Sequence, residues 1–163
     1  MGNLSALCFI TLQFVLLFLG NPVFCESQIE LTATDPVSVQ DVEAERQLIE
    51  LIRLHLNTSK LPYHPLLAKV SKMRAQEMAD LGILSHRDDE GKGPAERWAK
   101  AGGTRGLIGE IIGSGSQFED IITGWLNSPP HNSVLRGKEW ISFGLGVARL
   151  NQVWVVVVLF LGS

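Results

Sequence analysis

The stretch that decides the fold class runs from Val153 to Leu161 and reads VWVVVVLFL. It is almost entirely apolar and rich in β-branched side chains, and it is much shorter than the roughly 20 residues that a membrane-spanning helix needs. A short, unbroken apolar run is typical of a strand that is buried on both faces of a sheet. The sequence therefore predicts a central strand at this position.

Two further segments upstream have the character of strands. Leu107–Ile112 is predicted to be a short buried strand, and a turn near Leu150-Asn151 should connect the central strand to the segment before it. In that segment every second residue is apolar and the residues between are small, as in a strand with one buried face. The alternating apolar residues are Ile141, Phe143, Leu145 and Val147.

Elsewhere in the chain, apolar residues recur at the spacing of a helix and predict several helices. Helices are predicted over Val42–Asn57 and Leu66–Leu81, the second with Leu66, Val70, Met73, Met78 and Leu81 on or near one face and Gly82 as its C-cap. A short helix should start at Pro94 and end near Gly102, and another should follow a capping box at Ser116–Glu119 and stop at Pro129-Pro130. Helices and strands in this order predict an α+β fold with layers around one sheet.

Length and charge narrow the function classes. The 163 residues suffice for one domain, and 45% hydrophobic with 19% charged residues is a globular composition. The formal net charge is -3, from 14 basic and 17 acidic residues, with no basic block. This charge pattern argues against nucleic-acid binding.

The N-terminus has the pattern of an export signal. Leu4–Leu19 is an almost unbroken apolar run, and cleavage is predicted after Cys25, so that residues 1–25 form a signal peptide, 26–41 an extended leader and 42–163 the domain. An uncleaved anchor and a lipoprotein acylated at Cys25 are the alternatives. The only cysteines are Cys8 and Cys25, so the mature chain has neither a disulfide nor a thiolate zinc site. The predicted location is outside the cell or in the cell envelope.

Three residues stand out as candidates for chemistry. Glu110 is a carboxylate within an apolar strand, where it must be paired, hydrogen-bonded, metal-bound or neutralised. His86 precedes a charged loop and His131 follows the two prolines, and either alone is more often a surface or capping histidine. His55 and His64 are assigned no role. Spacing alone does not bring Glu110 and the two histidines together.

An ordered set of motifs resembles the signatures of bacterial-type CAP domains, the family of cysteine-rich secretory, antigen 5 and pathogenesis-related 1 proteins. The resemblance covers nearly all of Val42–Gly162 and implies a three-layer α-β-α sandwich with a central, mainly antiparallel sheet and a solvent cleft. The motifs are Leu84-Ser85-His86, Gly93-Pro94 with Arg97, Gly109-Glu110, Trp125-Leu126-Asn127-Ser128-Pro129-Pro130-His131 and Gly144-Leu145-Gly146-Val147-Ala148.

The same resemblance implies a site. In that family two histidines and acidic residues line the cleft and hold a divalent metal, often zinc, which transfers here to His86, Glu110 and His131. Three such donors and an open fourth position suit zinc and a water molecule. Ser128 also belongs to the cleft, at a position where many disulfide-rich relatives carry a second acidic residue.

Three functions remain open at this stage. The leading one is a non-catalytic, monomeric binding module for a small ligand, a lipid or an extracellular protein partner, by analogy with the sterol and fatty-acid binding known in the family. The second is a metal-assisted hydrolase, or a serine hydrolase with a Ser128, His131 and Glu110 triad. The third is a structural envelope domain in which the polar cluster only fixes loops. An enzymatic role is less expected than the other two.

Overall fold

The computed structural model describes residues 39–56 and 61–163. The predicted signal peptide, the predicted leader up to residue 38 and both cysteines lie outside these residues. Among the described residues, no helix has the length and apolar character needed to cross a membrane. In chain order the elements are α1 (Val39–His55), α2 (Pro65–Leu81), α3 (Pro94–Lys100), β1 (Leu107–Gly115), α4 (Phe118–Asn127), α5 (Pro129–Leu135), β2 (Trp140–Leu150) and β3 (Val153–Gly162).

The sheet is antiparallel and has β3 at its centre. The strand order is β1-β3-β2, and Val158 of β3 pairs with Ile111 on one side and with Leu145 on the other. A tight turn at Asn151, whose φ is 57°, joins β2 to β3. The prediction of a central strand from the apolar run is therefore confirmed.

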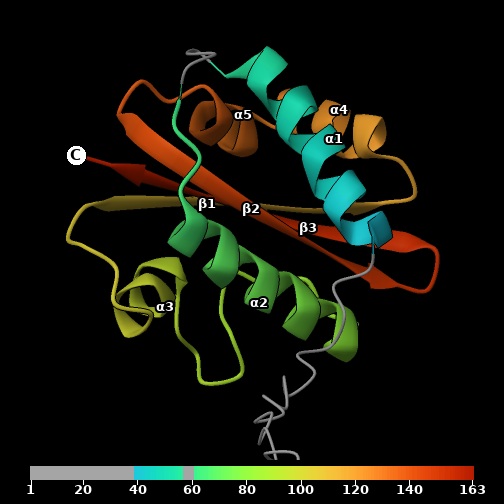
Figure 1. Cartoon of the computed structure of the whole chain (residues 1–163), viewed down its shortest axis with the longest axis horizontal. Helices are drawn as coiled ribbons and strands as arrows, with labels where there is room; N and C mark the ends of the chain where they lie inside the picture. Colours follow the sequence, from blue (N-terminus) through green and yellow to red (C-terminus); the bar gives the residue numbers. More distant parts are fainter. Residues whose placement is uncertain (1–38, 57–60) are drawn as a thin grey trace, which may run out of the picture. The chain divides into compact units, whose positions relative to one another are not determined.

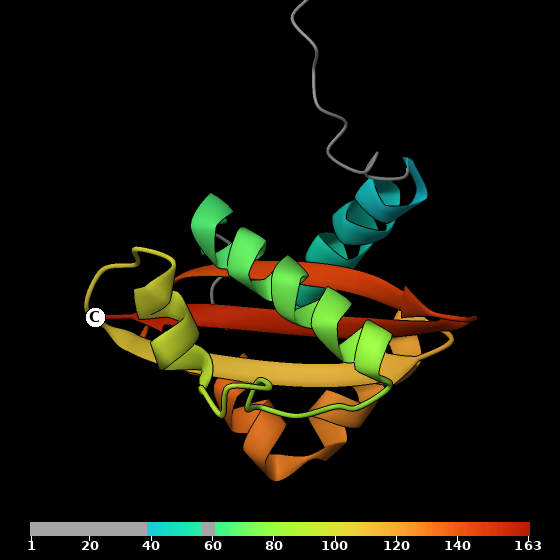
Figure 2. The same ribbon diagram turned by 90° about the horizontal axis from the view of Figure 1, so that it is seen from below.

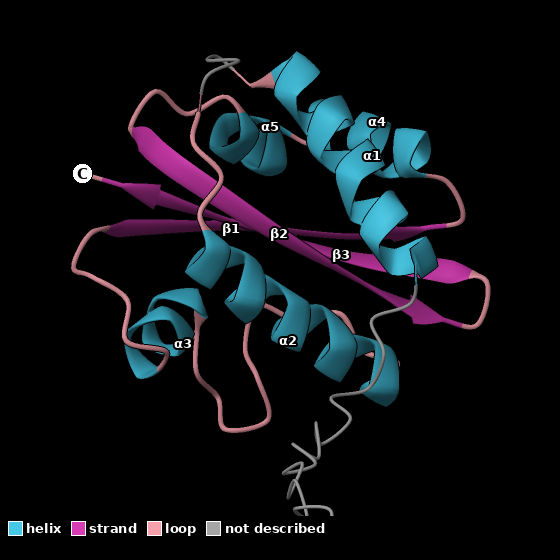
Figure 3. Ribbon diagram, viewed as in Figure 1, coloured by secondary structure: helices cyan, strands magenta, loops and turns pink. Residues whose placement is uncertain are grey.

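Helices cover both faces of this sheet (Figures 1 and 3). Val156, Val158 and Phe160 of β3 pack into a core with α1, α4 and α5. The alternate residues of β3 face α2 and α3 instead, where Val157 packs with Met78 and Leu159 with Trp98. The expected three-layer α-β-α sandwich is confirmed.

The helix α2 runs diagonally across the strands (Figure 2) and approaches β2 very closely. A Cβ atom at Gly144 would lie 2.3 Å from the backbone nitrogen of Ala68, and one at Gly146 would lie 2.2 Å from that of Lys72. Only glycine fits at these two positions. The prediction that β2 has a single buried face is wrong, because its small residues are buried beneath the backbone of α2.

This close approach also selects the buried face of α2. The small side chains of Ser71, Ala75 and Ala79 lie on the buried face, whereas Met73 and Leu81 are 64% and 57% exposed. The predicted face is confirmed at Val70 and Met78, which are buried, and is wrong at Met73 and Leu81. The close approach to β2 favours small side chains at the contact. Ile141 is also exposed, since the pairing of β2 with β3 shifts its register between Trp140 and Ser142.

Two helix starts differ from the predictions. The N-cap of α4 is Gln117, with no side-chain cap, so the capping box expected at Ser116–Glu119 does not form. The helix α1 begins at Val39, three residues before the predicted start, and includes Asp41 in its first turn, where a carboxylate favours the positive end of the helix dipole.

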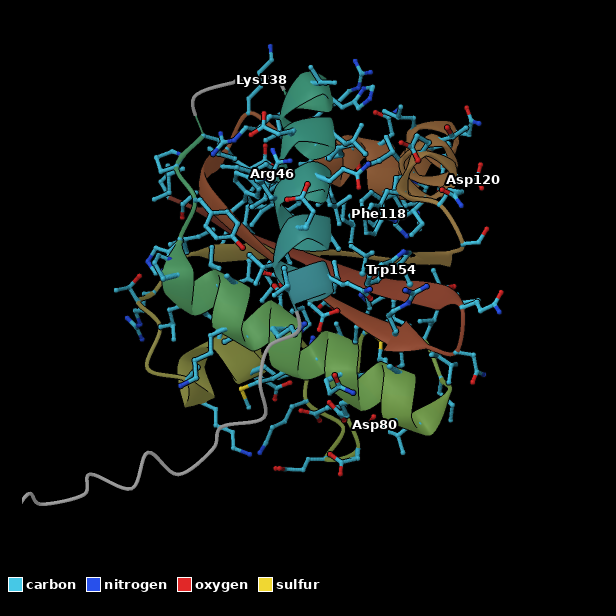
Figure 4. The ribbon with its side chains drawn as sticks, turned by 45° about the vertical axis from the view of Figure 1, so that its right-hand side comes forward. Arg46, Asp80, Phe118, Asp120, Lys138 and Trp154 are labelled. Carbon is cyan, nitrogen blue, oxygen red and sulfur yellow. The ribbon has the colours of Figure 1, made fainter. Side chains whose placement is uncertain are left out.

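Aromatic side chains close one end of the layer formed by α1 and α4. The rings of Phe118 and Trp154, both labelled in Figure 4, have their centroids 5.2 Å apart. The guanidinium carbon of Arg149 lies 4.3 Å from the centroid of the Trp154 ring on β3. This cluster ties the start of α4 to the edge of the hairpin formed by β2 and β3.

Candidate functional site

The loop that carries His86 starts where α2 ends. Gly82 adopts the left-handed conformation at the C-cap, with φ of 67°, as predicted for this glycine. The backbone N–H of Ile83 then donates to the carbonyl of Met78 at 3.2 Å, and the chain turns away from the helix. His86 follows in this loop with its side chain 56% exposed.

Glu110 lies on β1 with its side chain only 1% exposed, and each of its oxygens has a partner. Nδ1 of His86 lies 2.8 Å from Oε1, and Nη2 of Arg97 lies 2.5 Å from Oε2. Burying an unpaired carboxylate would cost several kcal/mol, on the order of the penalty for an ion that leaves water. Arg97 supplies the compensating charge, so Glu110 is paired and hydrogen-bonded, as its apolar surroundings required.

Arg97 is a site residue that the sequence motif contained but to which the sequence reasoning gave no role. It lies on α3 with a side chain 9% exposed. Besides its bond to Glu110, its Nη1 donates to the backbone carbonyls of His86 at 3.0 Å and Lys92 at 2.8 Å. The signal that could have identified it is Glu110 itself, because a carboxylate in an apolar strand needs a buried cation.

A second buried arginine holds the same loop from α2. The side chain of Arg74 is 3% exposed, and its Nη2 donates to the carbonyls of Ser85 at 2.7 Å and Arg87 at 2.6 Å. Arg74 and Arg97, called here the arginine pair, thus bind three consecutive carbonyls around His86. Five hydrogen-bond donors in a rigid planar group suit arginine to this task. The backbone of the histidine loop is therefore fixed by the two helices on either side of it.

His131 lies in the first turn of α5 and is half-buried. Its Nδ1 is 2.7 Å from Oγ of Ser128, the N-cap residue of this helix. Glu110 makes its hydrogen bonds with His86 and Arg97, not with His131. The Ser128, His131 and Glu110 triad considered from the sequence is therefore not assembled.

One small pocket brings the two histidines together. It has a volume of about 180 Å³ and is lined by Leu84, Ser85, His86, Ile112 and His131. Nδ1 of His86 is hydrogen-bonded to Glu110, and Nδ1 of His131 is hydrogen-bonded to Ser128. Within residues 39–56 and 61–163, no group of three His, Cys, Asp or Glu side chains is arranged to hold a metal ion. The four predicted cleft residues, His86, Glu110, Ser128 and His131, are thus connected to the same pocket. The two histidines line it, and Glu110 and Ser128 are hydrogen-bonded to them.

Sequence comparison identifies the family. A model of the CAP family, described as the cysteine-rich secretory protein family, matches residues 47–160, which is more than half of the chain. The chain belongs to the CAP family. The similarity of the motifs around His86, Glu110 and His131 is therefore a family relationship, and the family membership predicted from them is confirmed.

Three relatives illustrate the range of this similarity. The Bacillus subtilis protein YkwD is 23% identical over 77% of this chain, which spans about half (51%) of that relative. An extracellular protein with an SCP domain from Bacillus anthracis has a TM-score of 0.65 and 22% identity, with 76% of this chain and 41% of that chain covered. An outer surface protein from Borrelia burgdorferi has a TM-score of 0.63 and 26% identity, with 77% of this chain and 94% of that chain covered.

Proposed function

We propose that this CAP domain is an exported binding module whose site is the pocket between His86 and His131, and that this pocket binds a divalent transition metal, zinc above all. One observation carries the proposal: both imidazoles line the same pocket, and each uses Nδ1 for a hydrogen bond to a neighbouring side chain. A histidine that donates from Nδ1 has its Nε2 lone pair free for a metal.

The proposed metal ligands are the two histidines alone, whereas the family resemblance implied His86, His131 and Glu110. Glu110 orients the His86 ring and is bound by Arg97, so it serves as the hydrogen-bond partner of a ligand and not as a ligand itself. Two imidazoles suit zinc, copper or nickel, with the other positions taken by water or by a bound molecule. When bound, such an ion would supply Lewis-acid character to the pocket.

The hydrolase alternative is weaker in this geometry. Both oxygens of Glu110 have partners, and its charge is balanced by Arg97. A general base must reach the reacting proton, and the Glu110 side chain is only 1% exposed and is held by its ion pair with Arg97. The structural role is better supported than the hydrolase role. The hydrogen bonds that join Glu110 to His86 and the arginine pair to the histidine loop form without a metal.

Export is part of the proposal and rests on two supports. The apolar N-terminal segment has the pattern of a signal peptide. The Bacillus anthracis structure is described as an extracellular protein and the Borrelia burgdorferi structure as an outer surface protein. Together they favour a function outside the cell or in the envelope.

Calorimetric titration of zinc into the metal-free protein tests the proposal. The parent should bind one zinc ion with a Kd in the micromolar range, and the His86→Ala, His131→Ala double variant should lose this binding. Glu110→Gln should weaken binding by roughly 10- to 100-fold, as loss of an orienting partner does. His55→Ala is the matched control, since His55 lies on α1 outside the pocket, and it should bind as the parent does. Equal binding by parent and double variant, or none by either, would leave the structural role as the better account.

A further inference from the structure

A second pocket, lined in part by both residues of the arginine pair, lies between α2, the loop at Asp88–Glu90 and α3. Its volume is about 510 Å³, within the range of small-ligand sites. None of the residues that line the histidine pocket lines this one. The apolar part of its lining consists of Leu66, Val70, Met73 and Ala101.

Most charged side chains of this second pocket already have partners. Arg74 pairs with Glu77 at 2.7 Å and Lys100 with Glu90 at 2.8 Å, while Arg97 pairs with Glu110. Two lining residues differ: neither the ammonium group of Lys69 nor the carboxylate of Asp89 makes an ion pair or hydrogen bond with any described residue. The pocket therefore offers one unpaired cation and one unpaired anion among the described residues.

The helix fixes the spacing of the backbone positions from which these two charges extend. Lys69, Met73 and Glu77 follow one another at intervals of four residues and so lie in one row along α2. The backbone N–H of Asp89 donates to Oε1 of Glu77 at 3.2 Å, which places Asp89 at that end of the row. Eight residues separate Lys69 from Glu77, or about 12 Å at 1.5 Å per residue. Between them Met73 presents an apolar side chain that is 64% exposed.

We propose that this pocket binds a short apolar peptide with free termini, its carboxylate at Lys69 and its amino group at Asp89. An extended chain advances about 3.3 Å per residue, so a span of about 12 Å corresponds to three or four residues. The apolar side chains of the peptide would pack on Val70 and Met73. A fatty acid or another anion with an apolar tail would satisfy Lys69 but would leave Asp89 without a partner. The inference does not depend on metal binding by His86 and His131.

Calorimetry with the tetrapeptide alanyl-leucyl-leucyl-alanine tests the proposal directly. The free peptide should bind, and either N-acetylation or C-amidation should weaken binding by about 2- to 5-fold, the range of one exposed ion pair. In the Lys69→Gln variant C-amidation should no longer matter, and in the Asp89→Asn variant N-acetylation should no longer matter. Each variant thus removes the response to one end of the peptide only.

Matched controls are Lys138→Gln and Asp120→Asn, which change exposed charges outside the pocket (Figure 4). These two variants should discriminate among the peptides as the parent does. NMR should also show the Met73 methyl signal shifting on titration with the free peptide. Failure to bind at millimolar peptide, equal binding of free and capped peptides, equal binding of a long-chain carboxylate, or unchanged discrimination in Lys69→Gln and Asp89→Asn would each overturn the proposal.

Discussion

The two faces of the sheet are packed by different means. Beneath α1, α4 and α5, large side chains such as Leu48, Phe143 and Phe160 fill the space and are fully buried. Beneath α2, the helix backbone rests directly on Gly144 and Gly146. The α2 side also contains the arginine pair, which fixes a polar loop. The first face is thus packed mainly by large apolar side chains, whereas the second combines close backbone packing with the fixing of the loop that carries His86.

The largest effect should come from breaking the buried ion pair on the α2 side. Arg97→Met removes the charge that compensates Glu110, and the free energy of unfolding at neutral pH should fall by about 3–5 kcal/mol. The Arg97→Met, Glu110→Gln double variant should recover a substantial part of this loss, because the carboxylate left without its partner is then neutral. Urea unfolding followed by circular dichroism measures both. A loss below about 1 kcal/mol in the single variant would mean that Arg97 does not compensate a buried charge on Glu110.

A smaller effect should distinguish backbone packing from side-chain packing. Gly146→Ala places a methyl group against the backbone of α2 and should cost about 1–3 kcal/mol. On the other face, Phe160→Leu should cost about 1 kcal/mol, since neighbouring side chains can adjust. The control is Gly124→Ala on α4, where nothing lies within 4 Å of the added Cβ and the helix should gain up to about 1 kcal/mol. A smaller cost for Gly146→Ala than for Phe160→Leu would contradict this comparison.

The smallest effect concerns the exposed loop between α2 and α3. Hydrogen bonds from Lys100 and Lys92 lower the pKa of Glu90 from 4.5 to about 2. A lowered carboxyl pKa stabilises the fold above the unfolded value, so this contribution should disappear as the pH falls from about 4.5 to about 2. Lys100→Gln should raise the pKa of Glu90, measured by NMR titration of its carboxyl carbon, and should hardly change stability because the group is exposed. An unchanged pKa would assign the shift to Lys92.

The sequence predicted those parts of the fold that depend on local pattern. The run at Val153–Leu161 identified the central strand because a strand with helices on both faces buries nearly all of such a segment, here all but Val153 and Trp154. The face of α2 was misjudged because it depends on Gly144 and Gly146, which lie more than 60 residues away in the chain. The small residues recur at regular intervals in both elements, but neither pattern alone shows which element it will meet.

The sequence predicted which side chains would lie near one another at the candidate site, but not how they would be hydrogen-bonded. Glu110 had to find a partner, and family motifs pointed to His86 and His131. The bonds from Arg74 to the carbonyls of Ser85 and Arg87 could not be inferred, because any residue type supplies a carbonyl. The two hydrogen bonds of Glu110, to His86 and Arg97, are likewise visible only in the structure, and on them rests the proposal that Glu110 orients a ligand.

The position of β3 in the sheet also determines when the domain can form during synthesis. The strand at the centre of the sheet is the last of the described elements to be made, and both β1 and β2 pair with it. Until Val153–Gly162 has been synthesised, α1 and α2 have no completed sheet on which to bury their apolar faces. The helices of both layers therefore gain their full packing surface only after this last of the described strands has been made.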